Sequence, residues 1–332
     1  MAAPVIVEVT RGSEVESRHH GEIAVVEAAP PGPLRFSLGD PEALVCMRSL
    51  AKPFQALPLV ASGAAAAFGF GPEELAIFCG SINGQDFQVA LVERVLARIG
   101  LTPAALQCGI HAPQHRPTAK ALAAGGQKPT ALHHNCAGKH SGMLALCVHQ
   151  GWPVESYLDP EHPLQRLILQ TVAETLGLLP EQIPVVIDGC GAPVFFVPLR
   201  RIAWGYARLA AAPPDSNAGM LIAACLSHPR HIAGDGRLET DLMQALPGRV
   251  FAKAGAEGGY ALALVREGLG VALKIEDGNQ RAIAPTVMAL LEHLQILSPQ
   301  AREALAAYRT PPVLNFHKQA VGEIRAVFAV KD

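Results

Sequence analysis

Short runs of alternating or β-branched apolar residues open the chain and return towards its end. Three runs lie before residue 40, each closed by a turn residue or a charge, and three later runs are separated by glycine-containing turns typical of hairpins. The sequence predicts these strands, and a closing one, at Val5–Val9, Gly21–Glu27, Leu34–Leu38, Arg249–Lys253, Gly259–Arg266, Val271–Asp277 and Glu323–Val330.

Between about Pro53 and Leu226 the pattern changes to alanine- and leucine-rich segments with helical spacing. The predicted helices are Glu73–Cys79, Phe87–Ile99, Ser141–His149, Pro163–Leu176 and Asn217–Leu226, with a further one at Pro285–Leu297. Because strands at both ends enclose these helices, we predict an α+β fold. The N- and C-terminal strands would share one antiparallel sheet, and the helical middle would cover it.

We expect a single domain over residues 1–332, since no internal repeat, low-complexity tract or long linker divides the chain. Its sheet-forming parts would be residues 1–48 and 248–332, and its mainly helical part residues 49–247. Functional groups should then gather where the helical part meets the sheet.

Composition and charge exclude several classes of protein. The 332 residues carry 27 Lys+Arg against 29 Asp+Glu, a net charge of -2, and 50% hydrophobic residues, as expected of a globular protein with a large core. Nucleic acid is not an expected partner, because no cluster of basic residues is present to bind phosphates. A membrane span is not expected either, because the longest apolar stretch, Leu57–Gly71, is short and interrupted by serine and glycine.

The N-terminus and the cysteines favour a cytoplasmic protein. Ala2–Val7 is too short and too polar to be the apolar part of a signal peptide. The seven cysteines are odd in number and spread along the chain, so we expect buried thiols or a metal site rather than disulfides.

Ser49 and Lys52, in the segment R-S-L-A-K-P, are the first candidates for chemistry. Three residues apart on a helix, they project from the same face. Pro53 is tolerated only in a first turn, so the helix must begin near Ser49, at the positive end of its dipole. A neutral Lys52 could remove the hydroxyl proton there, provided that burial or a second lysine lowers its pKa. Spacing alone nevertheless favours a simple helix cap beside a solvated lysine.

Two cysteines lie in segments that resemble glycine-rich turns, N-C-A-G-K-H-S-G-M and D-G-C-G-A-P, where a backbone can approach a ligand closely. A zinc ion held by Cys136 and Cys190 would need further nitrogen or oxygen ligands. Lys139, His140 and Asp188 are the candidates nearest in sequence. On spacing alone, two unconnected buried thiols explain the pattern at least as well.

A second serine and a second lysine occupy comparable turns. Ser81 lies in C-G-S-I-N-G-Q ahead of a predicted helix, and Lys253 ends a predicted strand before the turn A-G-A-E-G. Lys253 could therefore pair with Ser49 or Ser81 where the helices meet the sheet. Taken singly, a capping serine and a surface hairpin lysine are the simpler interpretations.

Six motifs in one order give the chain a family resemblance. They are R-S-L-A-K-P-F-Q-A-L-P-L-V, L-Q-C-G-I-H, N-C-A-G-K-H-S-G-M, D-G-C-G-A-P, A-G-D-G-R and K-A-G-A-E-G. Together they resemble the rhizobial-type L-asparaginases, also called class 3 or the asparaginase II family, from about Val5 to Val330. The resemblance implies a fold similar to the serine β-lactamases, penicillin-binding proteins and glutaminases. It also implies a homodimer.

The resemblance also assigns roles. Ser49 matches the family's nucleophile and Lys52 its activating lysine, while Ser81 and Lys253 match a second serine–lysine pair. The implied zinc ligands are Cys136, Lys139 and Cys190 with a water, supported by Asp188. No organic cofactor is implied. Arg48 is a candidate anchor for the substrate α-carboxylate, and His140 and Asp188 are candidate substrate contacts, although a buried structural role suits Arg48 and His140 equally well.

The function we predict is hydrolysis of L-asparagine to L-aspartate and ammonia through an ester on Ser49. The turn at Ser81 departs from the family, because S-I-N-G-Q replaces the more usual S-H-S-G-E and removes an imidazole and a carboxylate. Three alternatives therefore remain open. The substrate could be glutamine, a β-lactam or a D-amino-acid peptide; the protein could be a silent metabolite-binding paralogue; or a metal-bound hydroxide could be the nucleophile.

Overall fold

The computed structural model describes residues 2–329, which form two compact units that alternate along the sequence. The sheet unit consists of the described parts of Met1–Val45, Val197–Ala211 and Asp241–Asp332. The helical unit consists of Cys46–Phe196 and Ala212–Thr240. Residues 197–211, which the sequence places in the helical part, belong to the sheet unit, and the single domain stays a prediction.

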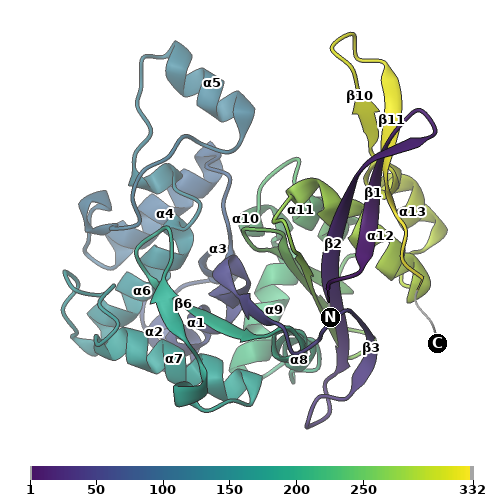
Figure 1. Ribbon diagram of the computed structural model, residues 1–332. Helices are drawn as coiled ribbons and strands as arrows, with labels where there is room; N and C mark the ends of the chain where they lie inside the picture. The colour runs from purple at the N-terminus through teal and green to yellow at the C-terminus, as the bar shows by residue number, and fades with distance from the viewer. Residues whose placement is uncertain (1, 330–332) are drawn as a thin grey trace. The chain divides into compact units, whose positions relative to one another are not determined.

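The sheet unit is built on one antiparallel sheet of order β10-β11-β1-β2-β9-β8-β7, with β3 paired to β2 (Figure 1). Its strands are β1 Val5–Arg11, β2 Glu14–Glu27, β3 Leu34–Leu38, β7 Val250–Ala254, β8 Gly259–Leu264, β9 Leu269–Ile275, β10 Pro312–Leu314 and β11 Ala320–Ala326. N- and C-terminal strands therefore share one sheet, and the predicted α+β fold is confirmed.

Two strands differ from their predicted bounds by more than two residues at one or both ends. β2 begins at Glu14, seven residues before the predicted strand. Its first half alternates charged residues in a partly exposed ribbon with β1, where Arg18 pairs with Glu8, so hydrophobic pattern could not reveal it. The closing strand is β11, which ends at Ala326, and Val330 lies outside the described residues.

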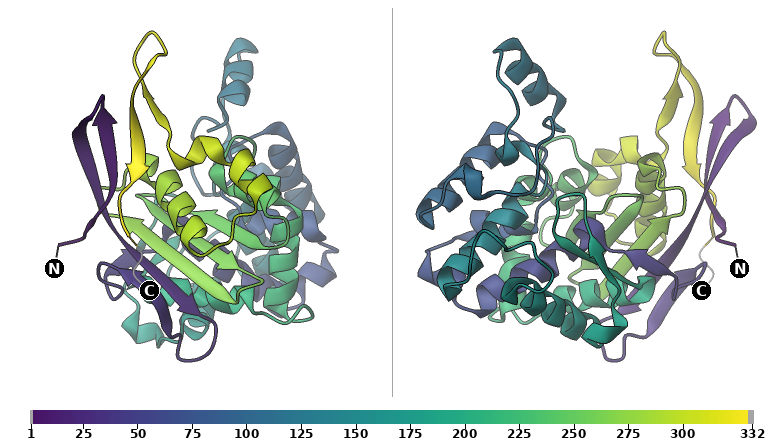
Figure 2. Two further views of the ribbon diagram at one scale, coloured as in Figure 1. Left: turned by 90° about the vertical axis from the view of Figure 1, so that its right-hand side faces the viewer. Right: turned by 60° about the vertical axis from the view of Figure 1, so that its left-hand side comes forward.

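Helices pack onto this sheet from several parts of the chain. Helix α8, Leu199–Ala210, lies against β9 and β2, and Gly270 permits the approach because a Cβ there would come within 1.9 Å of the Ala203 carbonyl oxygen. This contact explains why residues 197–211 join the sheet unit. The other helices at the C-terminal end are η5 Gln280–Ala282, α12 Ile283–His293, α13 Pro299–Ala304 and α14 Ala306–Arg309, and Figure 2 shows α12 and α13 in front of the sheet in its left view.

The helical unit contains the predicted helices of the middle of the chain. They are α3 Pro72–Cys79, α4 Asp86–Arg98, α6 Ala137–Gln150, α7 Pro163–Leu176 and α9 Asn217–Ser227. The other elements of this unit are η1 Arg48–Ala51, α1 Lys52–Ala61, α2 Ala64–Ala67, η2 Pro103–Ala105, α5 Arg116–Ala124, η3 Ala131–His133, η4 Pro180–Gln182 and α10 Pro229–Ile232. A small sheet of order β4-β6-β5 (Leu44–Cys46, Pro193–Pro198 and Val185–Ile187) and helix α11, Leu238–Ala245, occur near the sequence boundaries between the units.

Helix α6 starts earlier than its sequence suggests. The sequence predicts a glycine-rich turn at N-C-A-G-K-H-S-G-M, but α6 begins at Ala137 and includes both glycines of this segment. They serve packing rather than a turn, because a Cβ at Gly138 would lie 2.3 Å from the Ile77 carbonyl oxygen of α3, and one at Gly142 would lie 3.0 Å from the Phe78 ring. Close packing of α6 on α3 therefore requires glycine at both positions.

Gly138→Ala should destabilise the protein by about 2 to 3 kcal/mol, because the added methyl meets backbone that cannot yield without moving α6 or α3. Gly125→Ala is the matched control, since its φ is -81° and no atom lies closer than 3.5 Å to the added carbon. The control should change stability by less than about 0.5 kcal/mol. Urea unfolding midpoints measure both, and equal midpoints for the two variants would contradict this account of the α6–α3 contact.

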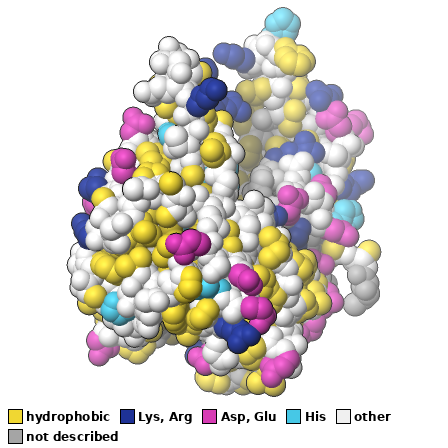
Figure 3. Space-filling view, turned by 90° about the vertical axis from the view of Figure 1, so that its left-hand side faces the viewer, with side chains coloured by type: hydrophobic (Ala, Val, Ile, Leu, Met, Phe, Trp, Pro, Cys, Tyr) yellow, Lys and Arg dark blue, Asp and Glu magenta, His cyan; other side chains and the backbone are white. Residues whose placement is uncertain are grey.

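The surface carries mixed charge. On the face shown in Figure 3, lysine and arginine side chains are interspersed with aspartate and glutamate. Within residues 2–329, no helix is both long and apolar enough to cross a membrane.

Candidate active site

Ser49 lies in the short 3-10 turn η1, immediately before helix α1. Pro53 occupies the first turn of α1, so the prediction that a helix begins near Ser49 is confirmed. The Ser49 side chain is half-buried, and among the described residues its hydroxyl has no hydrogen-bond partner. Arg48 adopts a φ of 44°, a left-handed conformation that is costly for a residue other than glycine. Backbone strain thus lies next to the candidate nucleophile.

Lys52 is the first residue of α1, and its side chain is only 1% exposed. Its Nζ lies 2.8 Å from the Gly80 carbonyl oxygen, 2.9 Å from the Ser81 Oγ and 3.1 Å from the Asn135 carbonyl oxygen. Burial lowers the pKa of Lys52, as a proton-accepting role requires. The hydroxyl that Lys52 contacts is therefore that of Ser81, whereas the sequence pointed to Ser49.

Lys253 lies on β7 of the sheet unit, as predicted, and is fully buried. Its Nζ donates a hydrogen bond to the neighbouring Ala254 carbonyl oxygen at 2.9 Å. Because Ser81 belongs to the helical unit and bonds to Lys52, the second serine–lysine pair that the sequence suggested remains a prediction.

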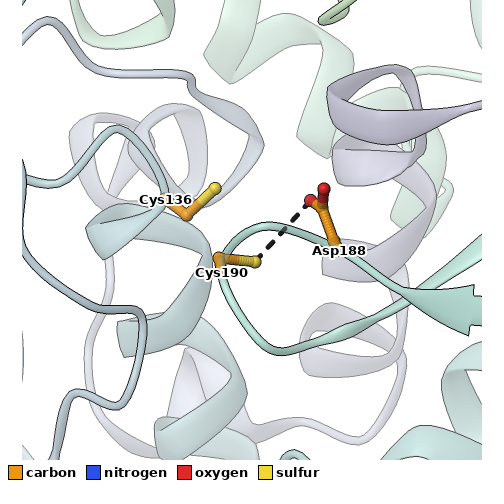
Figure 4. A group of neighbouring side chains, drawn as sticks. All are labelled: Cys136, Asp188 and Cys190. Carbon is orange, nitrogen blue, oxygen red and sulfur yellow. Dashed lines mark hydrogen bonds between the residues drawn. The ribbon is translucent and has the colours of Figure 1, made fainter.

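The predicted metal residues lie together in the helical unit. Cys136 precedes the first turn of α6, Lys139 lies in that turn, and Asp188 and Cys190 lie in the turn between β5 and β6 (Figure 4). One ligand atom from each of Cys136, Asp188 and Cys190 lies within 4.8 Å of the others. The Lys139 Nζ is 3.1 Å from the Cys190 Sγ, and that sulfur is 3.7 Å from the Asp188 Oδ2. Two sulfurs and a carboxylate are donors that suit zinc, and the Lys139 amine could join them only after losing its proton.

Charges in this cluster favour a thiolate. A hydrogen bond from Cys190, aided by the positive charge of Lys139, holds the pKa of Cys136 well below its usual value. The pKa of Cys190 is raised, because it donates to that thiolate and is buried. Burial acts to lower the pKa of Lys139, but the two sulfurs outweigh it and the net shift is upward. The cluster can thus present a thiolate to a metal ion.

The three candidate substrate contacts already have protein partners. The Arg48 Nε lies 2.5 Å from the Asp188 Oδ1, in a charge contact that lacks the alignment of a hydrogen bond. His140 is fully buried, and its Nδ1 lies 2.6 Å from the Tyr157 hydroxyl. Burial lowers the pKa of His140 well below its usual value, so the ring is neutral. Its Nε2 has no partner among the residues that the structure describes.

Comparison with known proteins identifies the family. The model for L-asparaginase II matches residues 7–326. The chain belongs to the L-asparaginase II family. The resemblance seen in the six motifs is thereby confirmed, and the protein is a hydrolase acting on amides. No curated protein shows a significant sequence match to the chain.

Solved structures similar to the chain have low sequence identity. Mglu in its native form with 4.3 M NaCl is 15% identical over 83% of this chain and 61% of its own, with a TM-score of 0.42. A β-lactamase from Mycobacterium bovis is 14% identical over 87% and 95%, with a TM-score of 0.39. Simvastatin synthase from Aspergillus terreus is 11% identical over 87% and 90%, with a TM-score of 0.34. With TM-scores below 0.5, these likenesses add no argument to the topology described above.

The side-chain amides of Gln85 and Gln88 hold the turn that follows Ser81, where S-I-N-G-Q departs from the pattern of the resemblance. The Gln88 Oε1 accepts hydrogen bonds from the backbone N–H groups of Asn83, Gly84 and Gln85, at 3.1 to 3.2 Å. The Gln85 Nε2 donates to the Asp235 Oδ2 at 2.9 Å, and its Oε1 accepts from the Asp235 backbone N–H at 2.8 Å. A carboxylate in place of Gln85 could accept but not donate, so glutamine suits this partner better than the family's glutamate.

Gln85→Glu should therefore weaken the Ser81 turn, at a cost of about 1 to 2 kcal/mol at pH 7, because two carboxylate oxygens would face each other. Arg230 and Gln85 hold the pKa of Asp235 below its usual value, so the introduced carboxyl is the one that takes up a proton as the pH falls. Once protonated it can donate, and the loss should shrink towards pH 4. Thermal midpoints across this range test the prediction, with the exposed Gln127→Glu as control. A loss that is independent of pH would contradict it.

Sequence patterns did not reveal the groups that hold the site in place. The carbonyls of Gly80 and Asn135 around Lys52, Gln88 beneath the turn, and Tyr157 beside His140 have no motif of their own. The motif L-Q-C-G-I-H has no role that its sequence indicates. In the structure its Gln107 backbone N–H donates a hydrogen bond to the Tyr157 hydroxyl at 3.0 Å.

Proposed function

We propose that the protein hydrolyses L-asparagine to L-aspartate and ammonia through a β-aspartyl ester on Ser49. The observation that carries this proposal is the buried Lys52, whose lowered pKa and contact with Ser81 supply a proton acceptor beside two serines in a chain of the L-asparaginase II family. A charged surface lysine would not serve as a base at neutral pH.

In this mechanism the Ser49 Oγ attacks the side-chain amide carbon of asparagine, and Lys52 takes up the hydroxyl proton. Ser81 is bonded to Lys52, so it can pass that proton to the departing nitrogen as the C–N bond breaks and ammonia leaves. Lys253 is the proposed second lysine for this relay. Water then hydrolyses the ester and releases aspartate. Backbone N–H groups at the start of α1 would stabilise the oxyanion, an effect worth about 3 to 4 kcal/mol per donor in other acyl-transfer enzymes.

Zinc is the proposed metal of the cluster. Cys136, Lys139 and Cys190 would hold it, with Asp188 in support, and zinc bound there would polarise and orient the substrate. Arg48 remains the proposed anchor for the substrate α-carboxylate and His140 the proposed hydrogen-bonding group beside the metal. Both would act from the positions that their protein partners fix.

Ammonia release measured against asparagine and glutamine, with and without a chelator, tests the proposal. We expect the higher kcat/KM for asparagine. A higher value for glutamine, or hydrolysis of a chromogenic β-lactam in place of either amide, would assign another substrate. Thermal stabilisation by asparagine without turnover would instead identify a binding protein.

A further inference from the structure

Two backbone carbonyls hold the side-chain nitrogen of Lys52 in place. The Lys52 Nζ donates to the carbonyl oxygens of Gly80, at 2.8 Å, and Asn135, at 3.1 Å, and it lies 2.9 Å from the Ser81 Oγ. Both carbonyls can only accept, so they bind this nitrogen whether or not the amine is protonated. The two carbonyls thus keep the Lys52 Nζ beside the Ser81 hydroxyl.

The Gly80 carbonyl belongs to a firmly held part of the backbone. Gly80 follows α3, its N–H donates to the Ile77 carbonyl at 3.0 Å, and the next N–H, that of Ser81, donates to the Ile232 carbonyl at 2.7 Å. Helix α3 fixes this group without help from a side chain.

The Asn135 carbonyl, by contrast, lies in the connection between η3 and α6. It accepts from the Ile82 N–H at 3.2 Å as well as from Lys52, and the Asn135 N–H donates to the His111 Nε2 at 3.0 Å. The His111 Nδ1 lies 2.7 Å from the Ala112 carbonyl oxygen, which can only accept. Nδ1 therefore carries the proton, and Nε2 is left as the acceptor for Asn135. A side chain from the L-Q-C-G-I-H motif thus holds the backbone of this connection.

We propose that His111 is a positioning residue: by accepting the Asn135 N–H, it keeps the Asn135 carbonyl on Lys52 and so holds the Lys52 Nζ beside the Ser81 hydroxyl. This inference rests on the proposed function for its effect on rate, but its structural part does not. His111 itself contacts no reacting atom in the proposed mechanism. Its loss should therefore lower kcat and leave substrate binding largely unchanged.

Two variants at this position separate the hydrogen bond from simple packing of the ring on His134, whose centroid is 4.4 Å away. His111→Leu removes the acceptor, whereas His111→Gln keeps an oxygen that can accept from Asn135. For His111→Leu we expect kcat with asparagine to fall about tenfold or more, with KM changed less than about twofold. His111→Gln should retain kcat within about threefold of the parent.

His133→Leu is the matched control, because the half-buried His133 also accepts a backbone N–H, that of Thr130 at 3.1 Å, without leading to Lys52. It should keep the parent kcat. A parental kcat in His111→Leu, or an equal loss in a folded His111→Gln, would overturn the proposal. If His111→Leu fails to fold, His111→Phe takes its place, because it also lacks the acceptor but keeps a ring against His134.

A crystal structure of the His111→Leu or His111→Gln protein gives a readout that does not need activity. We expect the Asn135 carbonyl oxygen to leave hydrogen-bond distance of the Lys52 Nζ in the leucine variant and to stay in the glutamine variant. An unmoved carbonyl in the leucine variant would overturn the inference. A parent protein that releases no ammonia from asparagine would instead contradict the proposed function, and the crystals would still test the positioning role.

Discussion

Ser49→Ala is expected to lower kcat for ammonia release from asparagine by about six orders of magnitude, the loss typical of removing a nucleophile from an acyl-transfer site. The fold should be almost unaffected, because the half-buried Ser49 hydroxyl has no hydrogen-bond partner among the residues described. Steady-state kinetics and thermal midpoints measure the two effects. Ser62→Ala, at the other end of α1, is the control and should keep the parent kcat, because its hydroxyl bonds only to nearby backbone.

Ser81→Ala makes the test specific, because Lys52 contacts the Ser81 hydroxyl and not that of Ser49. If Ser49 is the nucleophile and Ser81 the relay, Ser81→Ala should lower kcat by about 10²- to 10³-fold, a smaller loss than that of Ser49→Ala. The opposite ranking would make Ser81 the nucleophile. Substantial activity in Ser49→Ala that a chelator abolishes would indicate a metal-bound hydroxide. Ser49→Ala combined with Lys52→Met should be scarcely worse than Ser49→Ala alone, because the two residues act in one step.

The architecture could be predicted from sequence because it depends on local pattern. Alternating apolar residues marked the buried strands, and Pro53 marked the start of α1. Sequence pattern did not predict the structure where a residue is required by a neighbour that is distant in sequence but close in space. Gly138 and Gly142 suggested a turn, whereas they permit α6 to lie on α3, and the charged first half of β2 lies in a ribbon with little apolar surface.

The site shows the same limit. The proximity of Lys139 to Cys190, 51 residues apart, came from the family resemblance and not from spacing. Spacing on one helix suggests Ser49 as the partner of Lys52, and that pairing stays a prediction. The contact of Lys52 with Ser81 has no such pattern, because a long buried side chain can reach an adjacent element. Carbonyl groups such as those of Gly80 and Asn135 have no sequence signature at all, since every residue carries one.

Replacing a proposed zinc ligand is expected to have the second large effect, which is loss of the bound metal. The protein should contain about one zinc ion per chain, and Cys190→Ser should remove it, because sulfur is the strongest donor that this cluster offers. Zinc content by mass spectrometry and the thermal midpoint measure the change without reference to activity. Cys147→Ala is the matched control: this thiol lies on α6 with Lys139 but outside the cluster, and burial raises its pKa to about 12.

Lys139→Met and Asp188→Asn then show which of these two residues binds the zinc ion and which only supports the ligands. If Lys139 holds the metal and Asp188 assists, Lys139→Met should lose zinc as fully as Cys190→Ser, whereas Asp188→Asn should weaken binding about 10- to 100-fold, as loss of a supporting group does. Competition with a chromogenic chelator gives the two affinities. The reverse order would make the Asp188 carboxylate the ligand and leave Lys139 as a buried cation paired with thiolate. Normal zinc content in Cys190→Ser would remove the metal site from the proposed mechanism altogether.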